Sequence, residues 1–352
     1  MTIVLKIRHS LAVLALAAAV AGCSTPPPPA PPPAAPPPPA PPPIALSGQV
    51  LQAAAGYQDY MRHDAAISED FHSGDDVAQS LRSSDNYDPV ELLQGAIAYG
   101  AVAALQDPTF VGSLRKFAEN PEGRLQMART ILNDPNYATA IPGADSAAGL
   151  VESALTSVAQ PVVSKGAAVQ QAAYTIQHQS WSKENVVDRD GRLAAAKAIS
   201  PEPMKPDSAD VRRLGDAATG ATPIAITAGP AKGPYPPVVV HALAVAALAA
   251  LGQAGDDNAP LIMSMMGDAA SQKCLDMAKL NLYQCLAVSR PHYEDVFCLG
   301  QHVLTDTGQC MLYAAGTPEP VTAPIAVSKT EVAYGAKAGP TKKKKKKGDN
   351  EG

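Results

Sequence analysis

A stretch of 18 residues made only of Pro and Ala limits where a folded body can begin in this chain. Residues 26–43 contain 14 prolines. Because proline lacks a backbone N–H and its ring fixes φ, this stretch cannot form a helix or join a sheet. We expect an extended polyproline II segment, which at about 3.1 Å per residue spans roughly 55 Å. The pattern predicts a spacer followed by a folded body that begins at Ile44.

The residues before the spacer have the pattern of a bacterial export signal. Two basic residues precede an apolar run from Leu11 to Val20, which is shorter than the ~20 apolar residues that span a bilayer. The run ends in Val20-Ala21-Gly22-Cys23, which resembles the lipobox of bacterial lipoproteins. The resemblance implies that residues 1–22 are a signal peptide and that Cys23 becomes the lipidated N-terminus.

The residue after the lipobox cysteine helps to predict in which membrane a lipoprotein resides. In the enterobacterial sorting rule, Asp at this position retains a lipoprotein in the inner membrane, and here the residue is Ser24. The resemblance therefore implies an outer-membrane lipoprotein facing the periplasm. The acyl chains on Cys23 would anchor the protein in the membrane. Each CH₂ group buried in the bilayer contributes about 0.8 kcal/mol to membrane binding.

Composition predicts helices and an acidic body. Aromatic residues make up 5% of the chain, and Ala is abundant, which favours closely packed helices over sheets. Residues 23–320 carry 18 basic and 30 acidic side chains, a net charge of −12, whereas the tail from residue 321 is at +5. A body this acidic argues against nucleic acid as a partner.

We expect an all-α, Ala-rich helical bundle flanked by extended or disordered segments. Val238 to Leu251 is the most apolar segment, and we interpret it as a buried central helix. The Pro- and Gly-rich loop at residues 220–237 is a candidate boundary between two subdomains. The predicted organisation is a signal peptide (1–22), lipidated Cys and spacer (23–43), helical body (44–219), loop (220–237), helical subdomain (238–315) and disordered Lys-rich tail (316–352).

Four further cysteines predict a stapled helical hairpin. An even number of cysteines in an exported chain indicates disulfides. Ser289-Arg290-Pro291 is a helix stop and restart between the second and third cysteine. Two antiparallel helices joined there would pair Cys285 with Cys298 and Cys274 with Cys310. Zinc sites usually have cysteines two to four residues apart, and because that spacing is missing we assign no metal and no cofactor.

The sequence contains fragments of catalytic motifs, but none occurs with the other motifs that its family requires. Ser113-Leu-Arg-Lys116, Ser180-Trp-Ser-Lys183 and Ser84-Asp85-Asn86 resemble pieces of the serine acyltransferases that cross-link peptidoglycan. Their order in the chain is reversed, and no Lys-Thr-Gly strand follows them. We interpret them as chance tripeptides and helix-surface residues, and we assign no catalytic residue.

The tail has one sharp feature. Lys342, Lys343, Lys344, Lys345, Lys346 and Lys347 form an uninterrupted basic run. Its natural envelope partners are lipid A phosphates, anionic lipid heads or acidic wall polymers, and near such a surface each Lys adds about 1 kcal/mol. There are two alternatives: the tail is solvated and binds nothing, or it binds the acidic body.

These features favour a non-enzymatic envelope lipoprotein that presents a helical scaffold to another envelope component. One alternative is a helical peptidoglycan-acting enzyme such as a lytic transglycosylase, for which Glu152 and Glu184 are the candidate acids. Another is a lipid- or small-molecule-binding domain with a pocket beside Val238 to Leu251.

Overall fold

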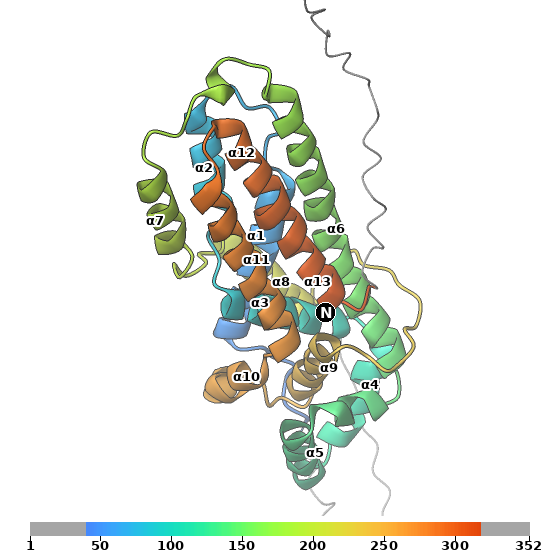
Figure 1. The fold of residues 1–352 in the computed structure, drawn as a ribbon. Coiled ribbons are helices and arrows are strands. Elements are labelled where there is room, and N and C mark those ends of the chain that lie inside the picture. Colours follow the sequence, from blue (N-terminus) through green and yellow to red (C-terminus); the bar gives the residue numbers. More distant parts are fainter. Residues whose placement is uncertain (1–39, 318–352) are drawn as a thin grey trace, which may run out of the picture. The chain divides into compact units, whose positions relative to one another are not determined.

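The computed structural model describes residues 40–317, and within them it is all-α (Figure 1). Cys23, the spacer up to residue 39 and Lys342 to Lys347 lie outside the described residues. The only β contacts in the described part are two isolated bridges, Leu46 with Ala254 and Asn185 with Pro291. The elements are α1 (Gly48–Ala65), α2 (Gly74–Ser84), α3 (Pro89–Ala104), α4 (Pro108–Ala118), α5 (Pro121–Asn133), η1 (Pro135–Ala140), α6 (Ala144–Ile176), η2 (Trp181–Lys183), α7 (Arg189–Ile199), α8 (Ser208–Thr219), α9 (Pro237–Ala250), η3 (Asp256–Asn258), α10 (Ala259–Met265), α11 (Ala269–Val288), α12 (His292–Cys298), η4 (Leu299–Asp306) and α13 (Thr307–Ala314).

Capping residues set where many of these helices begin. The side chains of Asp88, Asp107 and Asn120 accept hydrogen bonds from the first-turn N–H groups of α3, α4 and α5, and Pro follows each of them. Such a start satisfies an otherwise unpaired donor and uses the fixed φ of Pro. The same signal at Asp134 opens only the short 3₁₀ segment η1.

Two apolar helices form the centre of the bundle. Twelve of the 16 residues of α3 and twelve of the 14 residues of α9 are buried. A Cβ added at Gly100 of α3 would lie 2.9 Å from the Cβ of Ala242 in α9, so small residues allow the two backbones to approach closely. α1 and α6 also pack against α3. The loop between α8 and α9 therefore joins helices that share one core.

The C-terminal hairpin has the predicted disulfides. α11 runs antiparallel to a continuous helix formed by α12, the π-helical segment η4 and α13 (Figure 1). Cys285–Cys298 closes the hairpin near its turn, and Cys274–Cys310 closes it further along, with Cα–Cα distances of 5.8 and 5.7 Å. The expected nested pairing is confirmed.

Glycines bring this hairpin against α6. A Cβ added at Gly166 of α6 would lie 2.8 Å from the carbonyl oxygen of Gly300 in η4, and one added at Gly308 of α13 would lie 2.7 Å from Val163. The nearby Thr305 hydroxyl donates to the Gly300 carbonyl at 2.8 Å and accepts from Gln170. The π-helical segment is thus fixed where two backbones meet.

The segment that leads into α1 is bound to the folded body. Arg115 of α4 donates to the carbonyl oxygens of Pro41, at 3.4 Å, and Pro42, and also to that of Ala250 at the end of α9, at 3.2 Å. Gly252 has a φ of +69° and packs directly against the Pro42 ring, which leaves no room for a Cβ. The last prolines of the predicted spacer are therefore fixed on the body.

Candidate functional site

A small cavity lies where α1 faces the 83–86 segment and the segment that precedes α8. Its volume is about 170 Å³, enough for a few water molecules or a small polar ligand. It is lined by Gly56, Asp59, Tyr60, His63, Ser83, Asn86, Met204, Lys205 and Pro206. The side-chain oxygen of Asn86 is buried and accepts no hydrogen bond from the described residues.

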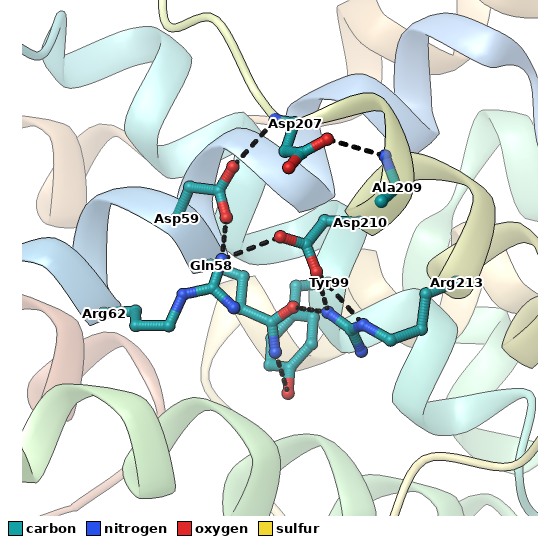
Figure 2. A network of polar contacts seen from close by, with 8 residues as sticks. All are labelled: Gln58, Asp59, Arg62, Tyr99, Asp207, Ala209, Asp210 and Arg213. Atoms are coloured by element: carbon teal, nitrogen blue, oxygen red, sulfur yellow. Dashed lines mark hydrogen bonds and ion pairs between the residues drawn. The ribbon is translucent and has the colours of Figure 1, made fainter.

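A network of charged side chains, which includes the cavity residue Asp59, ties α8 to α1 (Figure 2). Arg62 bridges Asp59 and Asp210, with 2.8 Å to the Asp210 carboxylate. Arg213 donates to Asp210 at 2.9 Å and also to Gln58. Each arginine therefore joins a residue of α1 to Asp210 near the start of α8.

Two further hydrogen bonds extend the network. Gln58 donates to the hydroxyl of Tyr99 in α3 at 3.3 Å. The backbone N–H of Asp207 donates to Asp59 at 3.0 Å, and the Asp207 side chain caps α8 at Ala209 (Figure 2). The network thus fixes both the segment that lines the cavity and the helix that follows it.

The two carboxylates of this network, Asp59 and Asp210, have opposite pKa shifts. The hydrogen bond from Arg62 lowers the pKa of Asp210 to about 2. Partial burial raises the pKa of Asp59, and its neighbour Asp210 adds to the increase. Burial also lowers the pKa of His63 in the cavity wall, which favours the neutral imidazole. The cavity wall thus contains a carboxyl with a raised pKa, Asp59, and a histidine with a lowered pKa, His63.

A larger pocket of about 530 Å³ lies between α2 and α7. Its walls are mainly apolar, and charged groups stand at its edges. It is lined by Ser73, Gly74, Asp75, Ala78, Leu81, Arg82, Val186, Val187, Asp188, Gly191, Arg192, Ala195, Ala196, Leu286, His292 and Asp295. Val187 is fully exposed to solvent. An apolar pocket with a few polar groups suits a small amphipathic molecule.

Two arginines of α7, of which Arg192 lines this pocket, bind carbonyl oxygens at the end of α11. Arg189 donates to the carbonyl oxygens of Ala287 and Ser289 at 2.7 Å each. Arg192 donates to the Leu286 carbonyl and forms a buried ion pair with Asp295. These bonds satisfy carbonyls at the C-terminal end of α11 that have no partner within the helix.

The candidate acids of a transglycosylase do not share a cleft. Glu152 is near the start of α6, half-buried, and burial raises its pKa. Glu184 is exposed after η2, beyond the other end of α6. Residues 152 to 176 alone span about 36 Å at ~1.5 Å per residue. Ser113 and Lys116 are on α4, and Ser180 and Lys183 are near η2, so those motifs are also separate.

The tripeptide Ser84-Asp85-Asn86, which we interpret as a chance match, lies partly in the interior. Ser84 and Asp85 are buried, and Asp85 pairs with Lys279 of α11. Sequence reasoning also missed Asp64, which is fully buried in α1. A signal was present, since the core residues Val50, Ala54, Tyr57 and Met61 have helical spacing and position 64 continues it.

Comparison with known proteins leaves these sites to be judged on their geometry. No family model, no curated protein and no solved structure matches this chain. Among residues 40–317, no helix combines the length and the apolar character needed to cross a membrane. The same residues contain no cluster of three or more His, Cys, Asp or Glu side chains arranged to hold a metal ion.

Proposed function

We propose that this chain is a lipid-anchored envelope protein that presents a rigid helical body to another envelope component without catalysing a reaction. The observation that carries this proposal is the fixed entry of the chain into the body. Arg115 holds the carbonyls of Pro41 and Pro42, and Leu46 pairs with Ala254. A tether that ends in such a fixed attachment restricts how the body is oriented, which a flexible linker does not do.

The disulfides support the same proposal. Two bridges in one hairpin fit an oxidising compartment such as the periplasm. The lipobox resemblance at Cys23 supplies the anchor, and outer-membrane attachment follows from Ser24. The Lys342 to Lys347 run would contact anionic lipid A phosphates or wall polymers close to the membrane.

Acyl labelling and membrane fractionation test the anchor. In a bacterial host, we expect the full chain to incorporate an alkyne-tagged fatty acid and to fractionate with the outer membrane. Cys23→Ser should remain unlabelled and leave the membrane fraction. Label that persists in Cys23→Ser, or a wild-type chain without label, contradicts the proposal.

Crosslinking in intact cells tests the presentation of the body. A photo-crosslinker at exposed positions of α7 and α11 should give discrete adducts with an envelope protein or polymer. The same crosslinker in Cys23→Ser should lose those adducts, because the body is no longer held at the membrane. Purified peptidoglycan that is cleaved by the wild-type chain would instead favour an enzyme.

A second candidate function is small-molecule binding in the pocket between α2 and α7. The specific observation is the fully exposed Val187 at a pocket with apolar walls. Dodecanoate is a suitable amphipathic probe, measured by isothermal titration calorimetry. Ala195→Leu, which fills the pocket, should abolish binding, whereas Ala194→Leu on the same helix should not. Equal binding by both variants would exclude the pocket.

A further inference from the structure

A buried ion pair fixes the loop between α2 and α3. The Nζ of Lys279, in α11, lies 2.6 Å from Oδ1 of Asp85 and also donates to the Asp85 backbone carbonyl. The two side chains are only 6% and 1% exposed. The same Nζ lies 3.8 Å from the centre of the Tyr87 ring, and the Tyr87 hydroxyl is 3.0 Å from that of Thr307 in α13. The loop is therefore tied to two helices of the hairpin.

A second carboxyl lies beside this pair without a donor of its own. Asp64 of α1 is fully buried, and neither of its carboxyl oxygens accepts a hydrogen bond from the described residues. The nearby hydroxyl of Tyr60 uses its hydrogen for the Ser84 carbonyl, at 2.9 Å. Only the Ser84 hydroxyl is left as a neighbouring donor. A buried carboxylate with so few donors is strongly disfavoured relative to the neutral acid.

The charges of the cluster lead to the same conclusion. Two ionised carboxyls beside one ammonium would leave a buried negative charge. A proton on Asp64 makes the cluster neutral and turns Asp64 from an acceptor without a donor into a group that can itself donate. We propose that the Asp64 carboxyl is a buried proton-binding site that couples the packing of the 84–88 loop against α1 to the pH.

The titratable groups around the site favour the protonated form. Burial raises the pKa of Asp64 to about 8, Asp85 adds to this increase, and Lys279 opposes it. On α1 the neighbours are Tyr60 and, in the adjacent cavity, His63. The loop contributes Asp85, Tyr87 and Asp88, and α11 contributes Lys279 and Tyr283. Tyr60, Tyr87 and Tyr283 have raised pKa values, so they remain neutral when Asp64 titrates.

The sign of the pH effect follows from linkage. The pKa of Asp64 is higher in the folded chain than the ordinary value of 3.8, so the folded state binds this proton more tightly. Stability is then lost as the pH rises from about 4 to about 8. Burial raises the pKa of Asp85 to about 6, so Asp85 contributes only to the lower part of this window. From pH 6 to pH 8 the lowered pKa of His63 has the opposite effect on stability, so the contribution of Asp64 is taken as the difference between the wild-type chain and Asp64→Asn.

Carbon-13 NMR of the wild-type side-chain carboxyls tests the site directly. Comparison with the Asp64→Asn spectrum assigns the Asp64 resonance. We expect it to titrate between pH 7 and pH 9, with backbone resonances of residues 84–88 shifting at the same midpoint. A normal titration near pH 4 overturns the proposal, and so does a loop that does not respond at that midpoint.

Urea unfolding from pH 6 to pH 9 gives an independent test. The unfolding midpoint of the wild-type chain should fall with rising pH, and that of Asp64→Asn should change markedly less. The control Asp276→Asn, at an exposed position of α11, should keep the wild-type slope. If Asp64→Asn retains the full wild-type slope, the proposal fails, and if this variant does not fold, the wild-type NMR titration decides.

Discussion

Arg192 and Asp295 form a buried ion pair that joins α7 to α12. The two side chains are 9% and 3% exposed, and the Arg192 Nη1 lies 2.5 Å from the Asp295 Oδ2. The Ser289 hydroxyl donates to the other carboxylate oxygen at 2.7 Å. Because α7 has only one buried apolar residue, Ala196, this pair and the carbonyl contacts of Arg189 attach the helix to the bundle.

We expect Asp295→Ala to destabilise the body strongly. Removing one partner leaves an unpaired buried charge on Arg192, which typically costs about 3–5 kcal/mol. Asp210→Ala is the matched control, since its ion pairs lie in the surface network and are expected to contribute below ~1 kcal/mol. Urea unfolding of both variants at pH 7 measures the difference. Equal losses would contradict the assigned role of the buried pair.

Because α6 packs closely against the π-helical segment, we expect Gly→Ala substitutions to have opposite effects on stability at Gly166 and at Gly112. In Gly166→Ala the new Cβ would meet the Gly300 carbonyl at 2.8 Å and also the Thr305 hydroxyl. Because both groups are held in place, we expect a loss of about 1–3 kcal/mol. Gly112→Ala in α4 has no heavy atom within 4 Å of its Cβ and should gain up to ~1 kcal/mol from helix propensity. Thermal unfolding of both variants checks the contrast.

Much of the fold was predictable because its signals are local. The Asp-Pro and Asn-Pro starts, the apolar run of α9 and the cysteine spacing around Ser289-Arg290-Pro291 each depend on neighbouring residues. The nested disulfides followed from one helix break and the helical period. By contrast, the Arg192–Asp295 and Lys279–Asp85 pairs join residues about a hundred or more positions apart, and no local pattern specifies which charges meet.

The candidate sites show the same limit. Asp64 could have been noticed, because a charged residue at a core position of an apolar stripe is unusual. The pocket between α2 and α7 could not, since its walls come from segments that meet only through tertiary packing. The hydrogen bonds from Arg115 to Pro41 and Pro42 could not be predicted either. A polyproline segment indicates a spacer, and its sequence does not show which residue of the body it contacts.

Arg115→Ala should release the entering chain while leaving the body folded. The Arg115 side chain supplies the hydrogen bonds to both proline carbonyls, so without it residues 40–46 lose their main polar attachment. We expect faster amide exchange at Ile44 to Ser47 and a change in Tm of only a few degrees. Arg129→Ala, at an exposed position of the neighbouring α5, should leave exchange there unchanged. Unaltered exchange in Arg115→Ala would contradict the fixed attachment.

The acid side of the stability profile should depend on Asp210. Its pKa is lowered to about 2 in the folded chain by Arg62, below the ordinary value of 3.8. A lowered carboxyl pKa contributes stability that is present above pH 4 and is lost as the pH falls from about 4 to about 2. Asp210→Asn lacks this titration, so its urea midpoint should fall less than that of the wild-type chain over this range. The control Asp134→Asn should follow the wild-type profile, because Asp134 caps the segment η1 outside the network. An Asp210→Asn profile parallel to that of the wild-type chain would show that Arg62 and Asp210 are not coupled in solution.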